Sequence, residues 1–262
     1  MIHETAIVSP KAKIGNNVQI GAYSVIGDDV ELKDGVEIMS HVCIEGRTIV
    51  GEGTKIFPFA AIGFRPQDLK FHGEPSKLVI GKNNSIREYV TMHPGTEGDR
   101  METTVGDGNL FMIGVHIAHD CVIGNNIVMG NNATLGGHVH IDDNVIIGGL
   151  AAVHQWTRIG TGAIIGGMSG VERDVIPYGN VKGERAFLCG LNIMGLKRAD
   201  VSRKDVQLLQ KVYDMIFSDD DLISNNLKKA QEFSTIQQVK DIIDFMQQKS
   251  ERSFCHPRHQ QK

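Results

Sequence analysis

The sequence predicts an all-β solenoid, a parallel β-helix of six-residue repeats that ends in an α-helical domain. Three features carry the prediction: an apolar residue at every sixth position, glycine after many of these positions, and a change to helical spacing near the C-terminus. A period of six fits neither a 3.6-residue helix nor the two-residue alternation of a flat strand. It fits a chain that turns a corner after each short strand, with three such sides to a coil.

The repeat begins at the start of the chain and runs without a gap to residue 62. We expect its apolar residues to point inward and to stack on their counterparts in neighbouring coils. We interpret the glycines that follow them, such as Gly15, Gly21, Gly27, Gly51 and Gly63, as corners whose backbone conformation a Cβ atom would obstruct. The apolar positions are Ile2, Val8, Ile14, Ile20, Ile26, Leu32, Ile38, Ile44, Val50, Ile56 and Ile62.

Two polar segments interrupt this pattern, near 64–79 and 93–104. Long loops on a stiff solenoid commonly carry binding groups, although a loop also accepts an insertion at little cost. After the first segment the repeat resumes in register, and after the second it resumes shifted by one residue. The later apolar positions are Ile80, Ile86 and Met92, then Val105, Phe111, Ile117, Ile123, Met129, Leu135, Ile141, Ile147, Val153, Ile159, Ile165 and Val171.

The pattern changes to helical spacing near the C-terminus. Apolar residues from Val206 to Ile216 recur at intervals of three and four, and Ser202 is a suitable N-cap. Further helices are predicted within 220–233 and 235–249. We therefore predict a β-helix over residues 1–185 and a helical domain over 186–262 that covers the open end of the solenoid.

The composition limits the classes of partner and the cellular location that we expect for this protein. The net charge of −4 gives no global basic field, so neither nucleic acid nor an anionic membrane is an expected partner. The cysteines at 43, 121, 189 and 255 form no CxxC pair, which indicates reduced thiols. The sequence shows no export signal and no apolar run of 18 residues, so we predict a cytoplasmic protein without membrane insertion.

One polar motif stands out within the repeat. The stretch GVHIAHDCVIG places His116, His119 and Asp120 among small and apolar residues. With three hexads to a coil, residues eighteen apart stack at a strand spacing of about 4.8 Å. Asp120 lies eighteen residues before His138, so we expect the two to share one edge of the solenoid.

Several motifs in their order along the chain give the sequence a family resemblance. PQDLKFHGEP, NSIREYVTMHPGT, HIAHDC, NNATLGGHV, AVHQW and GLNIMGLKR together resemble the UDP-N-acetylglucosamine O-acyltransferases that begin lipid A biosynthesis. The resemblance implies a left-handed β-helix and a homotrimer with active sites in the clefts between subunits. It implies no cofactor and no metal, because the thioester of acyl carrier protein is itself the donor substrate.

The reaction implied by the resemblance moves a 3-hydroxyacyl chain to the 3-hydroxyl of UDP-N-acetylglucosamine. A sugar hydroxyl needs a base, and histidine titrates in the right range. By resemblance His119 is the base, Asp120 orients its ring, and the Gly137 backbone N–H stabilises the developing oxyanion. The other residues that the resemblance places at the substrates are Asp68, Lys70, His93, His116, His138, His154, Gln155, Gly167, Asn192 and Arg198.

Some of these positions bear on specificity. Gly167 stands where the family sets acyl length, and its missing side chain is expected to admit a longer chain. Met194 and Ala199 stand where many members have glutamate and arginine, which leaves a 3-amino nucleotide sugar open as the acceptor. An acidic carrier protein requires basic groups beside the cleft, and the candidates are Lys197, Arg198, Arg203 and Lys204.

Other classes compete with this interpretation. A γ-class carbonic anhydrase is also a trimeric left-handed β-helix and binds zinc through histidines, for which HIAH and His138 are candidates. That class lacks the two insertions and the large helical tail. A non-catalytic scaffold and an N-acyltransferase of the same pathway are further alternatives, although the latter normally carries an extra N-terminal domain.

Overall fold

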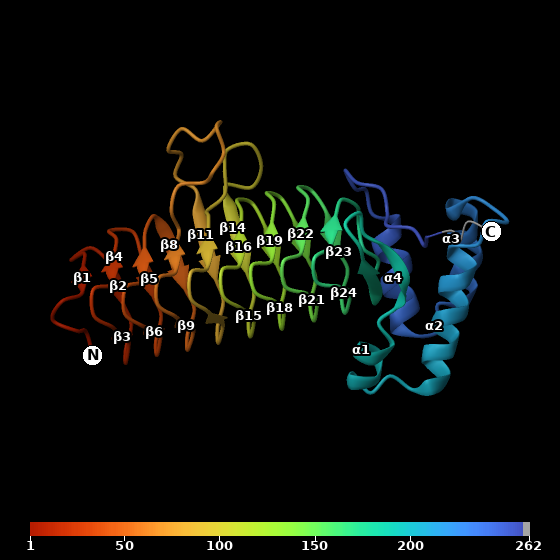
Figure 1. Ribbon diagram of the computed structural model, residues 1–262, viewed down its shortest axis with the longest axis horizontal. Coiled ribbons are helices and arrows are strands. Elements are labelled where there is room, and N and C mark those ends of the chain that lie inside the picture. Colours follow the sequence, from red (N-terminus) through yellow and green to blue (C-terminus); the bar gives the residue numbers. More distant parts are fainter. Residues whose placement is uncertain (259–262) are drawn as a thin grey trace.

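The computed structural model, described here for residues 1–258, is a left-handed parallel β-helix with helices at its C-terminal end (Figure 1). Strands from successive coils form three sheets, parallel throughout except for the antiparallel pair β26–β27 at the C-terminal end of one sheet. The nine-stranded sheet contains β1 (Ile7–Val8), β4 (Val25–Ile26), β7 (Cys43–Ile44), β10 (Ala61–Ile62), β13 (Thr91–Met92), β16 (His116–Ile117), β19 (Thr134–Leu135), β22 (Ala152–Val153) and β25 (Gly170–Val171).

The two other sheets complete the triangular cross-section. The eight-stranded sheet contains β2 (Lys13–Ile14), β5 (Glu31–Leu32), β8 (Arg47–Val50), β11 (Lys77–Ile80), β14 (Glu102–Val105), β17 (Val122–Ile123), β20 (His140–Ile141) and β23 (Arg158–Ile159). The ten-stranded sheet contains β3 (Gln19–Ile20), β6 (Glu37–Ile38), β9 (Lys55–Ile56), β12 (Ser85–Ile86), β15 (Leu110–Phe111), β18 (Val128–Met129), β21 (Ile146–Ile147), β24 (Ile164–Ile165), β26 (Gly179–Lys182) and β27 (Phe187–Leu191).

The six-residue pattern predicted the core correctly. From Val8 onward each repeat position is the last residue of its strand, and from Ile20 to Val171 none of these residues is more than 4% exposed. Ile2 is 48% exposed because no coil lies beneath it. Alternate strand residues point outward, so one side chain per short strand faces the core and its neighbour is available for surface chemistry.

The reason predicted for the recurring glycines was largely wrong. Of the five named, only Gly63 has a positive φ. The left-handed corners lie two residues further along and accept side chains, as at Tyr23. Glycine is needed instead because the next coil is close: a Cβ at Gly15 would lie 2.8 Å from the Asp34 backbone nitrogen, and one at Gly51 would lie 2.4 Å from the Gly81 carbonyl carbon.

The two inserted segments project from the solenoid side by side, in orange and yellow in Figure 1. Both are shorter than predicted, because β11 begins at Lys77 and β14 at Glu102. They are tied together, since the Glu97 N–H donates to the Glu74 carboxylate at 3.1 Å. The loops therefore brace one another beside the middle coils.

The helices gather at the C-terminal end of the solenoid (Figure 1). They are α1 (Ile193–Arg198), α2 (Arg203–Ile216), α3 (Ile223–Ala230), a short 3-10 turn (Gln231–Phe233) and α4 (Gln237–Gln247). Ser202 caps α2 as predicted, accepting from the Asp205 N–H at 3.1 Å. Helix α1 and the β26–β27 hairpin were not predicted. Within residues 1–258, none of the helices has both the length and the apolar character to cross a membrane.

Candidate active site

The corner of the coil at Asp120 holds a carboxylate–imidazole pair. His119 Nδ1 lies 2.8 Å from Asp120 Oδ2, and the Asp120 side chain is fully buried. Because an ionised carboxylate can only accept, Nδ1 carries the proton and Nε2 keeps the lone pair of the neutral ring. This is the tautomer that a general base requires.

The second inserted segment supports this pair. The Thr96 backbone N–H and hydroxyl both donate to the Asp120 carboxylate, the hydroxyl at 2.7 Å, and the Arg100 N–H donates at 3.3 Å. Burial alone raises the pKa of Asp120, but the hydrogen bonds from His119 and Thr96 outweigh it and lower this pKa below its ordinary value. Asp120 is thus an anion at neutral pH. No sequence pattern identified Thr96, because a loop has no period.

Gly137 lies directly against the His119 ring. A Cβ atom at position 137 would come within 2.6 Å of Cε1 and 2.7 Å of Nε2, so only glycine leaves room for the imidazole. Among the described residues no acceptor takes the Gly137 N–H, whereas the next N–H, of His138, donates to the His119 carbonyl at 3.0 Å. Gly137, whose N–H has no acceptor within residues 1–258, thus lies against the ring that carries the unprotonated nitrogen.

Two further histidines lie near His119: His116 is in β16, and His93 directly follows the neighbouring strand β13. The rings of His93 and His116 meet edge to face at 5.0 Å, and Thr91 Oγ1 lies 2.7 Å from His116 Nδ1. Burial, together with nearby His116 and His119, lowers the pKa of His93 to about 4, and burial also lowers that of His116. His93 Nδ1 is buried and has no hydrogen-bond partner among the described residues.

His138 occupies the next position along the same edge, as the spacing of eighteen predicted. Its Nδ1 lies 2.8 Å from Asp99 Oδ2, and its ring is parallel to that of Trp156, with centroids 3.8 Å apart. The rings of His119 and His138 meet edge to face at 4.9 Å. Neither Asp99 nor Trp156 was among the residues proposed from the sequence.

His154 and Gln155 lie in the following coil and are joined to the C-terminal tail. Arg252 donates to His154 Nδ1 at 2.7 Å and to the Gln155 carbonyl at 3.0 Å. Arg252 is 97 residues away in sequence, so no local pattern could have predicted this contact.

The remaining predicted site residues are not brought to His119 within one chain. Asp68 accepts from the Lys70 N–H in the first projecting loop, Gly167 is exposed on the corner before β25, and Arg198 is exposed at the end of α1. Asn192 is buried, caps α1 through the Gly195 N–H, and donates to the Gly162 carbonyl. Its side chain is therefore engaged in holding α1 on the solenoid.

One group of side chains has the composition of a metal site. The ligand atoms of His119, Asp120 and His138 lie within 4.8 Å of one another. The Asp120 oxygens already accept from Thr96, Arg100 and His119, so a metal ion would have to replace these bonds. The donor set therefore suits an imidazole–carboxylate pair better than a zinc centre.

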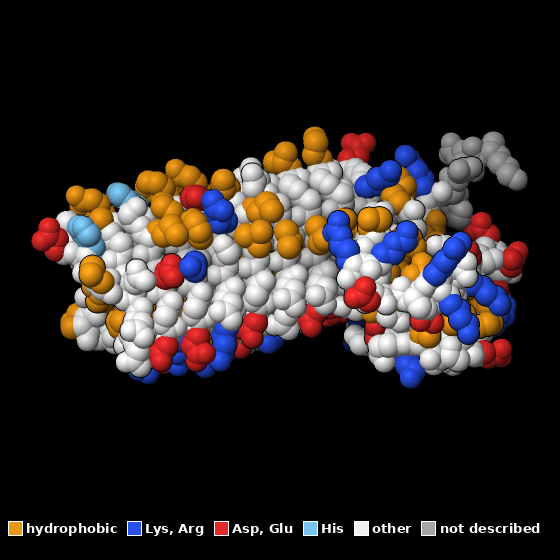
Figure 2. Space-filling model, turned by 90° about the horizontal axis from the view of Figure 1, so that it is seen from below, with side chains coloured by type: hydrophobic (Ala, Val, Ile, Leu, Met, Phe, Trp, Pro, Cys, Tyr) orange, Lys and Arg blue, Asp and Glu red, His pale blue; other side chains and the backbone are white. Residues whose placement is uncertain are grey.

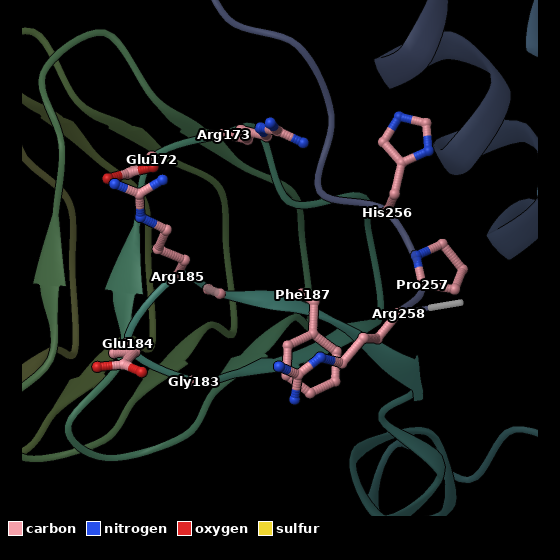
Figure 3. A pocket seen from close by; sticks show the side chains of 10 residues that line it. Glu172, Arg173, Gly183, Glu184, Arg185, Phe187, His256, Pro257 and Arg258 are labelled. Atoms are coloured by element: carbon pink, nitrogen blue, oxygen red, sulfur yellow. The ribbon is translucent and has the colours of Figure 1, made fainter. Parts of the chain in front are cut away.

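A large hollow lies away from this group. It has a volume of about 790 Å³ at the junction with the tail, and Figure 3 shows Arg173, Arg185 and Arg258 around it. None of the residues that line it belongs to the histidine group, by which we mean His93, His116, His119 and His138. We place the candidate active site at His119 because the chemistry of its neighbours, rather than the size of a cavity, supports it.

The stacked coils and the histidine–aspartate corner define a hexapeptide-repeat acyltransferase. A family model described as bacterial transferase hexapeptide (six repeats) matches residues 11–46 and 102–137, and one described as UDP N-acetylglucosamine O-acyltransferase, domain 2, matches 174–255. The chain belongs to the UDP-N-acetylglucosamine O-acyltransferase family.

Similar proteins cover nearly the whole chain. The acyl-(acyl-carrier-protein)-UDP-N-acetylglucosamine O-acyltransferase of Thermodesulfovibrio yellowstonii is 49% identical over 97% of this chain and 98% of its own length. The enzyme of that name from Caulobacter vibrioides is 47% identical over 98% of each chain. The crystal structure of Francisella novicida UDP-N-acetylglucosamine acyltransferase has a TM-score of 0.95 at 34% identity, covering 99% of this chain and 95% of that one.

Proposed function

We propose that this acyltransferase moves a 3-hydroxyacyl chain from acyl carrier protein to the 3-hydroxyl of UDP-N-acetylglucosamine, in lipid A biosynthesis in the cytoplasm. The single observation that carries the proposal is the His119–Asp120 pair with Gly137 against its free nitrogen. The names of the relatives supply the substrates. No cofactor is required, since the thioester is already activated.

The geometry supports a direct transfer. His119 Nε2 takes the proton of the sugar hydroxyl as its oxygen attacks the thioester carbonyl. The charge that develops on the carbonyl oxygen is stabilised by the Gly137 N–H, and Asp120 stabilises the imidazolium. When the C–S bond breaks, the carrier thiolate takes the proton from His119. Proton and charge are then balanced, and the base is regenerated.

No cysteine is needed as a nucleophile. Cys121 is the cysteine next to the Asp120 corner, but it is fully buried and its thiol donates to the Gly136 carbonyl at 3.3 Å. Burial raises its pKa to about 12. A thiol in this state is neither ionised nor accessible, which supports a single displacement over a covalent acyl-enzyme.

We further propose a homotrimer whose active sites lie between neighbouring copies. One edge of the solenoid, the aromatic edge, carries a row of four rings whose successive centroids lie 5.1–5.2 Å apart: Tyr23, His41, Phe59 and Tyr89. Tyr23, Phe59 and Tyr89 are 49–60% exposed. Figure 2 shows rows of hydrophobic side chains along the solenoid. Solvent-exposed apolar rows of this kind usually mark an interface.

The aromatic edge borders the sheet that contains β13 and β16, since Tyr89 lies two residues before β13; His93 directly follows β13, and His116 lies in β16. A second copy packed on it would therefore cover the open side of the histidine group. In this assembly we propose that Asp68 and Lys70 contact the substrates from a projecting loop and that His93 and His116 line the cleft. His93 Nδ1 is buried and has no partner within residues 1–258, so it is suited to a substrate hydroxyl.

We propose that residues around His119 and on the helical end select the substrates. Gly167 leaves the groove open to a long acyl chain, while His138, His154 and Gln155 position the sugar and the acyl carbonyl. Asn192 fixes α1, from which Arg198 is directed to the nucleotide. Lys197, Arg203 and Lys204 are exposed near the α1–α2 junction and are proposed to meet the acidic carrier; Figure 2 shows Lys and Arg side chains on this helical end.

Replacement of the base tests the function. His119→Gln keeps a polar side chain of similar size but cannot act as a base at neutral pH, so acyl transfer should fall by about two to four powers of ten. The matched control is His3→Gln, an exposed histidine at the far N-terminal end. Product formation from UDP-N-acetylglucosamine and acyl carrier thioesters, followed by mass spectrometry, measures the rate; circular dichroism checks the fold.

The same assay separates the alternatives. A His119→Gln enzyme as active as the wild type would support a scaffold or a different site. Stoichiometric zinc whose removal by a chelator abolishes activity would support the carbonic anhydrase class. A faster reaction with a 3-amino nucleotide sugar would change the acceptor but not the proposed base.

A further inference from the structure

His138 is held on three sides, more tightly than an exposed corner requires. Its side chain is only 10% exposed, with the Asp99 carboxylate on Nδ1, the Trp156 ring on one face and the His119 ring edge beside it. The Asp120 carboxylate is 4.0 Å from the same nitrogen, too far for a hydrogen bond, and is already engaged by Thr96 and His119. Asp99 is therefore the hydrogen-bond acceptor for Nδ1 of His138.

We propose that Asp99 is a positioning residue for His138, an inference that rests on the proposed acyl transfer. Because a carboxylate can only accept, Asp99 fixes the proton of the neutral ring on Nδ1 and leaves Nε2 as the acceptor for substrate. Trp156 fixes the plane of the ring by parallel stacking. Asp99 thereby does for His138 what Asp120 does for His119.

Both carboxylate–imidazole pairs depend on one turn. Thr96 donates to Asp120, and its carbonyl accepts the N–H groups of Asp99 and Met101 at 3.3 and 3.1 Å. The turn from Thr96 to Met101 thus holds the acid of the first pair and supplies the acid of the second. The two imidazoles, which lie in adjacent coils, receive their orientation from the same inserted segment.

The test is a double-mutant cycle on the full-length protein. Asp99→Ala should lower kcat/KM for acyl transfer by about 10- to 100-fold, the usual effect of losing a residue that orients a functional histidine. In a His138→Gln background the same substitution should change kcat/KM by less than about twofold, because Asp99 acts only through that ring. Glu97→Ala, in the same turn but exposed and without a side-chain contact to an imidazole, should retain wild-type kcat/KM.

A second measurement does not depend on activity. Imidazole ¹⁵N shifts of histidine-labelled protein, assigned for His138 by the His138→Gln variant, should show the proton of the neutral ring on Nδ1 in the wild type and in Glu97→Ala. In Asp99→Ala they should show it moving to Nε2.

Equal losses of rate in both backgrounds, or an unchanged tautomer in Asp99→Ala, would overturn the role of Asp99. A wild-type protein without acyl transfer would overturn the proposed function, while the shifts would still decide the Asp99–His138 pair.

Discussion

His119 combines a proton-accepting nitrogen with a side chain that is only 11% exposed in a single chain. Such burial strengthens the interaction with Asp120 and restricts the ring to one orientation. The space for the ring is created by the missing side chain at Gly137. The site therefore depends on a residue without functional groups as much as on the imidazole.

Gly137→Ala should disable the base by displacement. The added methyl group would lie 2.6 Å from Cε1 of His119, closer than such atoms approach, so the ring must move. A shift of about 1 Å typically costs about a hundredfold in rate. Steady-state kinetics should show this loss in kcat, whereas Gly98→Ala, whose Cβ meets only Thr96 Oγ1 at 3.7 Å, should retain the rate. Equal rates for both variants would contradict this account of Gly137.

His93 should make the stability of the protein sensitive to acid. Its pKa is about 4 in the folded chain against an ordinary value of 6.5, so between these values the unfolded chain binds the extra proton. The contribution of the neutral His93 ring to the free energy of unfolding is fully present above pH 6.5. It is lost progressively as the pH falls to 4. Thermal unfolding of wild type should shift to lower temperature from pH 7 to pH 4.5, and His93→Gln should shift less. An identical shift in the variant would exclude His93 as the cause.

Spacing could predict the residues on the solenoid but not those that reach it from loops. Asp120 and His138 share an edge because eighteen residues make one coil, and this follows from the sequence alone. Thr96, Asp99 and Arg252 reach the histidines from irregular segments whose path no period determines. The six-residue period placed Asp120 and His138, but it could not identify Thr96, Asp99 or Arg252, whose contacts come from loops and the tail.

Arg158 joins the solenoid to the tail, since it pairs with Asp174 just beyond β25 and also donates to a carbonyl of α4. Arg158 in β23 donates to Asp174 Oδ2 at 2.8 Å and to the Phe245 carbonyl in α4 at 3.3 Å, and its guanidinium lies 4.4 Å from the centre of the Phe245 ring. Asp174 is completely buried. The helical end is therefore fastened to the solenoid by more than apolar contact.

Arg158→Ala should destabilise this junction strongly. It leaves the Asp174 carboxylate buried without its charged partner, which typically costs about 3–5 kcal/mol. Urea unfolding followed by helical circular dichroism should show an earlier transition. Arg203→Ala, which removes an exposed arginine at the start of α2, should change the stability by less than about 0.5 kcal/mol. A similar midpoint for both variants would show that the ion pair contributes little.

Helix α2 was predictable, whereas α1 was not. The Ser202 cap and the apolar residues at helical spacing define α2 locally. Helix α1 has only six residues, and its Asn192 cap also bonds to the Gly162 carbonyl of the solenoid. Such a short helix is stabilised by tertiary contacts, which a local pattern does not contain. The boundary at 185/186 remains a prediction.

The proposed trimer requires the aromatic edge to be covered. Tyr89→Lys replaces a ring that lies 5.2 Å from the Phe59 ring with a charged side chain, and it should weaken association. Light scattering should give three times the 28.7 kDa chain mass for wild type and a lower average for the variant. Leu222→Lys, on an exposed hydrophobic residue of the tail, should leave the mass unchanged. A monomeric wild type would contradict the assembly.

The exposed Ile2 at the start of the solenoid has a mechanical consequence. Each coil contacts only its immediate neighbours. Thermal fraying of the first coil therefore breaks only its contacts with the second coil and does not propagate to the middle coils. The opposite end is closed by the helices, so opening is confined to the terminus farthest from them. The molecule can thus loosen at its tip while the imidazoles stay aligned.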